Sequence, residues 1–228
     1  MKNTILEVEN LSVELDGEKI IRDLSFKVKK GDVVTILGPN GAGKTVLLKT
    51  LLGILPYQGE IKWKEGTRPG YVPQRLPFIK DVPMSVEEFF KLKNISTEEI
   101  NEVLNSVGFG DNFLKKKIGD LSSGQFQRTL IAWALVGNPN VLLFDEPTTG
   151  IDVSGEETIY SLLSRLKEER NLTILLVTHD LSVVSKFSNF VICLNRCSVC
   201  QGEPKEVLTP EVLNKFYGHE VKFYQHYH

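Results

Sequence analysis

The sequence predicts an α/β fold: a mostly parallel sheet, an antiparallel β subdomain at the N-terminus, and an inserted helical subdomain. Near the N-terminus apolar and polar residues alternate, as they do in strands with one buried face. Farther along, short apolar runs alternate with helical patterns, which indicates parallel strands joined by helices. Residues from about 76 to 137 have a predominantly helical pattern. We therefore expect a single domain over 1–228, with a core of 1–75 and 138–228 around the insert.

The composition is that of an ordinary globular chain. Of its 228 residues, 41% are hydrophobic and 25% are charged, and the formal net charge is -2. This balance does not indicate a nucleic-acid partner, whose binding surface would be strongly basic. No apolar run approaches the ~20 residues that span a bilayer, and the N-terminus does not resemble a signal peptide. The three cysteines, all between 193 and 200, do not resemble a secreted disulfide framework, so a cytoplasmic location is expected.

The first two strands form a predicted hairpin. Asp16-Gly17 is a turn signal between two alternating segments. The apolar positions of the outgoing strand are Leu6, Val8, Leu11, Val13 and Leu15, and those of the return strand are Leu24, Phe26 and Val28.

A glycine-rich turn then separates a strand from a helix. The apolar run 33–37 leads into Gly38-Pro39-Asn40-Gly41-Ala42-Gly43-Lys44-Thr45, and a helix is expected from Lys44 to about Leu52. This is the phosphate-loop pattern in its proper setting, which predicts a P-loop NTPase core. Glycines let backbone amides approach phosphate oxygens, and the helix N-terminus favours the same anion. Lys44 would neutralise the outer phosphates, and the Thr45 hydroxyl would ligate magnesium.

The middle segment begins with two helix-start signals. Ser85 to Glu88 and Ser96 to Glu99 both fit the capping box. Apolar residues at helical spacing follow the second of them, at Ile100, Val103, Leu104 and Val107.

Acidic residues close the buried strand 141–144. Ligands of open parallel sheets bind at such strand ends. Asp145 can hold magnesium there, and Glu146 can take a proton from an attacking water. Two solvated acids are the alternative, but the phosphate loop upstream favours the functional interpretation.

The string Leu121-Ser122-Ser123-Gly124-Gln125 opens another helix and offers a second anion site. An ordinary helix cap is the simpler interpretation of a lone Ser-Ser-Gly. With Gln127-Arg128 following, however, the string resembles the signature motif of the ABC transporter ATPases.

Other motifs of that family occur in the family's order. Residues 38–45 resemble its Walker A loop, Gln74 its Q-loop, and 141–147 its Walker B strand. Thr149 to Asp152 resembles the D-loop, and His179 the switch histidine. The resemblance covers residues 4 to 217, and six ordered motifs are far more specific than one.

The resemblance implies an ATPase with ATP and Mg2+ as cofactors, coupled to transport. Catalytic roles would fall to Glu146, His179, Lys44 and Gln74. Magnesium would be bound by Thr45, Gln74 and Asp145. The nucleotide would be bound by Leu15, Gly38, Pro39, Asn40, Gly41, Ala42, Gly43, Lys44, Thr45, Val46, Ser122, Ser123, Gly124, Gln125 and Asp152.

The resemblance also implies partners. Two copies would form a head-to-tail dimer, with ATP sandwiched between the loop of one and the signature helix of the other. The dimer would lie on the inner face of the membrane, on integral permease subunits served by an extracytoplasmic substrate-binding protein. Phe78, Ile79 and Met84 are the expected permease contacts, whereas Phe89 and Phe90 are expected to pack inside the subdomain.

The sequence departs from the family pattern at Leu15. The family usually has an aromatic residue there to stack on adenine, so a leucine predicts loose base selectivity.

The short single domain and the Tyr71-Val72-Pro73-Gln74 run resemble the zinc and manganese importer branch. An exporter of lipid, peptide or drug and a soluble non-transport ATPase of this family stay open as alternatives. A small-molecule kinase is disfavoured by the 121–125 helix.

The tail contains possible soft metal ligands. Cys193 lies in an apparent strand and is expected to be a buried apolar residue, so only Cys197 and Cys200 keep ligand spacing. Together with His219, His226 and His228 they leave a regulatory metal site open, although one cysteine pair is not a site.

Overall fold

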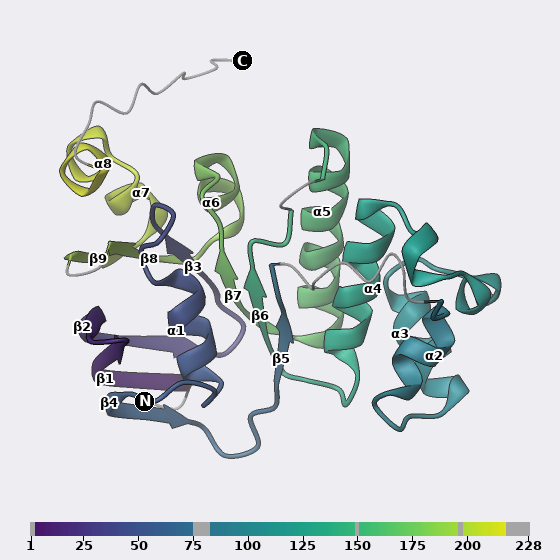
Figure 1. Ribbon diagram of the computed structural model, residues 1–228. Helices are drawn as coiled ribbons and strands as arrows, with labels where there is room; N and C mark the ends of the chain where they lie inside the picture. The colour runs from purple at the N-terminus through teal and green to yellow at the C-terminus, as the bar shows by residue number, and fades with distance from the viewer. Residues whose placement is uncertain (1–2, 75–82, 149–150, 196–197, 218–228) are drawn as a thin grey trace. The chain divides into compact units, whose positions relative to one another are not determined.

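The computed structural model describes residues 3–74, 83–148, 151–195 and 198–217 (Figure 1). The chain forms two compact units. The first consists of Met1–Gly66 together with Ile174–His228, and the second of Thr67–Thr173. The elements of each unit follow from local sequence signals and strand pairing within it.

In the first unit, the N-terminal strands form a three-stranded antiparallel sheet of order β2-β1-β4. It contains β1 (Thr4–Leu15), β2 (Glu18–Lys29) and β4 (Gln58–Trp63). Asp16 and Gly17 have φ values of 51° and 79°, the left-handed pair that a tight hairpin needs. The predicted hairpin is confirmed, and β4 adds a strand that the sequence did not predict.

The same unit contains buried strands in the order β7-β3-β8-β9. The parallel strands are β3 (Val33–Leu37), β7 (Thr173–Val177) and β8 (Phe190–Asn195), and β9 (Ser198–Gly202) runs antiparallel to β8. Every residue of β3 and β7 is buried, which is typical of parallel strands covered on both faces. The helices of this unit are α1 (Lys44–Leu51), α6 (Leu181–Phe187), α7 (Pro204–Val207) and α8 (Pro210–Tyr217).

The cysteines of the β8–β9 hairpin correct an expectation. Cys193 is fully buried, as predicted, but it forms a disulfide with Cys200, which lies opposite it in the register. Because Cys200 is bonded to Cys193, its sulfur is not available as a metal ligand in this disulfide form. Cys197 and the three tail histidines lie outside the described residues.

The second unit joins a parallel strand pair to a helical region. The strands are β5 (Pro69–Val72) and β6 (Val141–Asp145), with Val72 opposite Phe144. The helices are α2 (Val86–Lys91), α3 (Thr97–Ser106), α4 (Ser123–Leu135) and α5 (Val153–Arg170), with 3-10 turns η1 (Asp111–Lys115) and η2 (Ile118–Asp120).

Both predicted capping boxes form in this unit. Ser85 caps α2 with Glu88, and Ser96 caps α3 with Glu99. Phe89 and Phe90 are buried against Trp133 of α4, with ring centroids 4.3 and 5.6 Å from its indole. Their predicted internal packing is confirmed. Met84 is half-buried, whereas Phe78 and Ile79 lie outside the described residues.

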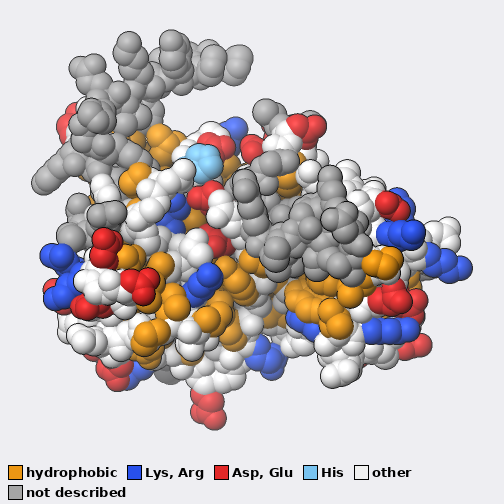
Figure 2. Space-filling model, viewed as in Figure 1, with side chains coloured by type: hydrophobic (Ala, Val, Ile, Leu, Met, Phe, Trp, Pro, Cys, Tyr) orange, Lys and Arg blue, Asp and Glu red, His pale blue; other side chains and the backbone are white. Residues whose placement is uncertain are grey.

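On the face that Figure 2 shows, acidic and basic side chains are interspersed rather than gathered by sign. No helix in the described part of the chain combines the length and the apolar character needed to cross a bilayer.

Candidate functional site

The phosphate loop lies between β3 and α1 in the first unit. Gly38 follows β3, and a Cβ atom there would lie 2.1 Å from the Leu194 carbonyl oxygen, so no side chain fits. Gly41 and Gly43 have φ values of 77° and 98°, which glycine adopts without steric cost. Gly43 is the N-cap of α1 and provides no side-chain cap in the described structure. The loop thus brings bare backbone to a helix N-terminus, the arrangement that binds anions.

The Lys44 side chain folds back over this loop. Its Nζ donates to the carbonyl oxygens of Gly38 at 2.9 Å and Pro39 at 3.0 Å, and the residue is 6% exposed. Buried charges need hydrogen-bonding partners, and here the loop supplies them. The ammonium group is therefore held at the loop, where the outer phosphates of a bound nucleotide would lie.

His179 lies just after β7. That strand pairs with β3, which leads into the phosphate loop. The β3 and β7 strands are parallel, with Ile36 opposite Val177, so the loop and His179 leave the sheet at the same edge. The Thr178 amide donates to the Ile36 carbonyl at 3.4 Å, and Asp180 caps α6 beyond. The His179 side chain is exposed, as a residue that contacts a ligand must be.

Two apolar residues of the N-terminal hairpin are candidates for contact with a base or ribose. Leu15 is half-buried at the end of β1, and its adenine contact stays a prediction. The sequence did not single out Ile20 of β2, whose Cγ2 would lie 2.9 Å from a Cβ atom at Gly43. Its position in an alternating strand gave no signal, because the contact depends on how the hairpin packs against α1.

The carboxylates lie in the second unit, at the end of β6. Asp145 is 2% exposed and accepts a hydrogen bond from the Tyr71 hydroxyl at 3.3 Å. Gln74 Nε2 donates to Glu146 Oε2 at 2.8 Å. Gln74 and Glu146 each lie two residues beyond a paired position, Val72 and Phe144, which explains how parallel pairing brings them together.

Glu146 has a strained backbone. Its φ of 47° lies in the left-handed region, which non-glycine residues occupy at a cost of roughly 1–3 kcal/mol. Such strain concentrates at functional sites. The conformation turns the chain sharply after β6 and coincides with the hydrogen bond from Gln74 to Glu146.

Tyr71 is a residue of this site that sequence reasoning did not assign. Burial raises the pKa of Tyr71 well above its ordinary value, and the charge of Asp145 and their hydrogen bond act in the same direction. The phenol is therefore neutral at physiological pH and can donate to the carboxylate. The signal that could have identified Tyr71 is the parallel pairing of 69–72 with β6, the strand that ends at Asp145.

The signature segment forms the start of α4 in the same unit. Ser122 and Gln125 make a reciprocal capping box, with both hydrogen bonds 3.2 Å long. The ordinary cap considered above is therefore present, and it leaves Ser123 exposed in the first turn.

This helix start and the start of α5 line one hollow of about 490 Å³. Asp152 caps α5 by accepting the Gly155 amide at 2.9 Å, and it lies in the wall of the hollow. The lining residues are Ser122, Ser123, Gly124, Gln125, Arg128, Ile151, Asp152, Gly155, Thr158 and Ile159. The structure thus brings the predicted signature and D-loop residues together.

The donor chemistry fits a hard cation. Magnesium prefers oxygen ligands, and Thr45, Gln74 and Asp145 offer a hydroxyl, an amide and a carboxylate oxygen. Within the described residues, no group of three or more His, Cys, Asp or Glu side chains is placed to hold a metal ion.

Comparison with known proteins identifies the family. A family model described as ABC transporter matches residues 21–149, which include the phosphate loop, the signature segment and both carboxylates. The chain belongs to the ABC transporter family. It is an ATP-binding subunit and an ATPase of that family, as the ordered motifs predicted.

Relatives match over nearly the whole chain. A zinc import ATP-binding protein, ZnuC of Brucella abortus, is 37% identical over 100% of this chain and 78% of its own length. ZnuC of Cereibacter sphaeroides is 39% identical over 95% of this chain and 89% of its own. Both proteins carry the same name.

Solved structures confirm the predicted fold class. An ABC transporter in an inward-facing conformation has a TM-score of 0.85 at 30% identity, over 95% of this chain and 90% of that one. The cbiO1 protein of Clostridium perfringens, part of the cbiONQ transporter complex, has a TM-score of 0.78 at 29% identity, over 93% of this chain and 94% of that one.

Proposed function

We propose that this chain hydrolyses ATP to drive the import of a divalent metal ion, zinc foremost, through a membrane permease. The observation that carries the proposal is the match of nearly the whole chain to zinc import ATP-binding proteins at 37% to 39% identity. The same match favours import over the exporter alternative. The net charge of -2 and the interspersed charges on the face that Figure 2 shows agree with a partner other than nucleic acid.

In the proposed reaction, the first unit binds the phosphates. Backbone amides of 38–45 would hold the β- and γ-phosphates, with the Lys44 ammonium transferring its contacts from loop carbonyls to phosphate oxygens. His179, at the same sheet edge, would contact the γ-phosphate and register its loss. Leu15 and Ile20 would supply apolar contact to the base or ribose.

The second unit would supply the hydrolytic groups. Magnesium, when bound, neutralises charge on the phosphate oxygens. Thr45, Gln74 and Asp145 would hold it. Glu146 would accept a proton from the attacking water, as a positioned carboxylate can.

The Gln74 amide would link metal binding to this base. Its Nε2 donates a hydrogen bond to Glu146, while its Oε1 is the atom that can coordinate magnesium. One side chain can therefore orient the base and bind the cation together.

The proposed assembly is a head-to-tail dimer on integral membrane permease subunits. Each chain carries one phosphate loop and one signature hollow, and a two-fold axis would pair each loop with the partner's hollow. Ser123 and Gly124 would then close over ATP bound to the other copy. An extracytoplasmic binding protein would deliver the metal to the permease.

Reconstituted transport tests the proposal. Vesicles containing the permease and this subunit, supplied with the binding protein, should accumulate radioactive zinc only with ATP present. Glu146→Gln should abolish uptake, whereas Glu157→Gln, at an exposed position of α5, should leave it intact. ATP hydrolysis without uptake of zinc or manganese would contradict the metal substrate while leaving the ATPase in place.

A further inference from the structure

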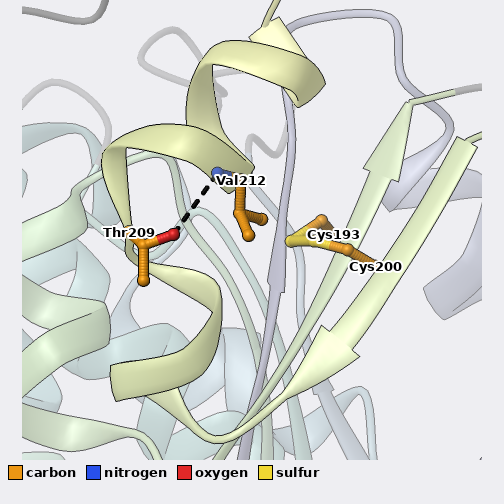
Figure 3. Close-up of a disulfide and its surroundings, with 4 residues drawn as sticks. All are labelled: Cys193, Cys200, Thr209 and Val212. Atoms are coloured by element: carbon orange, nitrogen blue, oxygen red, sulfur yellow. Dashed lines mark hydrogen bonds between the residues drawn. A yellow bond between two sulfur atoms is a disulfide. The ribbon is translucent and has the colours of Figure 1, made fainter.

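The disulfide of the first unit is a covalent feature that nucleotide hydrolysis does not use. Cys193 on β8 and Cys200 on β9 lie opposite each other, with Cα atoms 4.9 Å apart (Figure 3). That separation is within the range that a disulfide spans. The bond joins a central strand to the strand that leads into α7 and α8.

The two sulfurs differ in exposure. Cys193 is fully buried in an apolar cluster, whereas Cys200 is partly exposed beside it. The buried members of the cluster are Leu37, Val184, Val191, Cys193, Val207 and Leu213. Cys200 is therefore the sulfur that a soluble thiol or disulfide can reach.

The cluster is continuous with the phosphate loop. Leu37, the last residue of β3, is both a cluster member and the register partner of Cys193. Gly38, just after β3, and Leu194 of β8 approach so closely that a Cβ atom on the glycine would lie 2.1 Å from the leucine carbonyl oxygen. The backbone immediately after Cys193 thus forms the wall against which the loop begins.

The disulfide also secures the C-terminal elements. Val207 of α7 and Leu213 of α8 belong to the same cluster, and Val212 of α8 packs against it beside the disulfide (Figure 3). Without the bond, β9 is still paired with β8 through its ladder and held by this packing. Edge elements of this kind open locally at low free energy.

We propose that Cys193 and Cys200 are a reversible thiol–disulfide site, oxidised by low-molecular-weight disulfides, whose oxidised form strengthens nucleotide binding at the phosphate loop. The coupling to the loop rests on the proposed nucleotide binding. Oxidation fixes the strand that forms the wall of the loop, so less ordering is needed when ATP binds. Reduction loosens β9 and the helices behind it, and ATP binding then has to order them again.

The chemistry balances by thiol–disulfide exchange. The Cys200 thiolate attacks a small disulfide, forming a mixed disulfide and releasing one small thiol. The Cys193 thiolate then attacks the Cys200 sulfur, closing the protein disulfide and releasing the second small thiol. Two protein thiols are oxidised, one small disulfide is reduced, and the two protons pass to the released thiolates. A dithiol reverses both steps.

Thiol counting and ATP binding test the site on the full-length chain. After treatment with glutathione disulfide and unfolding in guanidinium chloride, a maleimide should label at most one of the three cysteines, and after dithiothreitol, removed before unfolding, it should label all three. A fluorescent ATP analogue should bind at least about fivefold more weakly to the reduced protein.

Two variants separate the pair from the third cysteine. Cys197→Ser should keep the full redox response, whereas Cys200→Ser should lose it and bind ATP as weakly as the reduced wild type. Labelling of all three cysteines after glutathione disulfide would overturn the site. Equal ATP affinities of the oxidised and reduced protein would overturn the coupling alone, and no ATP binding in either form would overturn the proposed function with it.

Discussion

At the scale of single residues, the site depends on which side chains lie beyond the ends of paired strands. The sequence predicted Gln74, Asp145 and Glu146 because each belongs to a recognisable motif. It missed Tyr71, whose role depends on the pairing of β5 with β6. The β5 strand begins with Pro69-Gly70, residues that are unfavourable in strands, so no local pattern indicated it.

Tyr71→Phe should lower the affinity of the site for magnesium. The variant removes one hydroxyl and leaves the buried Asp145 carboxylate without that donor, so its orientation is less defined. We expect the Mg2+ concentration that half-saturates binding of a fluorescent ATP analogue to rise about tenfold, while binding without Mg2+ is unchanged. Tyr57→Phe, at an exposed position, is the matched control. An unchanged Mg2+ requirement would show that Tyr71 does not position Asp145.

Gly38→Ala should disable the phosphate loop. The added methyl group would meet the Leu194 carbonyl oxygen, and because that atom is backbone, the loop must move away. We expect ATP affinity in equilibrium titrations to fall at least about tenfold. Gly110→Ala is the control, because a Cβ atom there meets nothing within 4 Å. Wild-type affinity in Gly38→Ala would mean that the loop does not bind ATP in this conformation.

At the scale of elements, the sequence predicted the features that depend on local residues but not the strand pairings between distant segments. Both capping boxes were predicted because each is complete within four residues. The sequence did not predict β4 and β9. Both strands are short and have little local pattern, and they form by pairing with β1 and β8. The disulfide was missed for the same reason: the number of cysteines does not indicate which two lie opposite each other.

Ser96→Ala should destabilise α3 without affecting catalysis. The Ser96 hydroxyl accepts the Glu99 amide at 3.2 Å, and loss of an N-cap costs about 1 kcal/mol. For a chain of this length we expect the unfolding midpoint to fall by about 2–4 °C, with ATP hydrolysis unchanged at lower temperature. Differential scanning calorimetry measures the midpoint, and Thr97→Ala provides a neighbouring control. An unchanged midpoint would mean that the box contributes no stability.

At the scale of the whole molecule, each compact unit contains a different part of the candidate site. The first holds the phosphate loop and His179, and the second holds the carboxylates and the signature hollow. The sequence predicted the order of the motifs along the chain but not this division, because it placed the phosphate loop and the carboxylates in one core of 1–75 and 138–228. It could not predict the hollow, which exists only because the starts of α4 and α5 lie together.

Glu146→Gln should therefore accumulate as an ATP-bound dimer. The variant keeps the phosphate loop but lacks the base, so ATP stays intact and holds the two copies together. Size-exclusion chromatography with light scattering should show a dimer with ATP and a monomer with ADP. Adding Ser123→Arg should keep the protein monomeric with ATP, since a long charged side chain would fill the rim of the hollow, whereas Asn105→Arg, an exposed residue of α3, should not. A dimer that tolerates Ser123→Arg would place the partner's nucleotide somewhere other than this hollow.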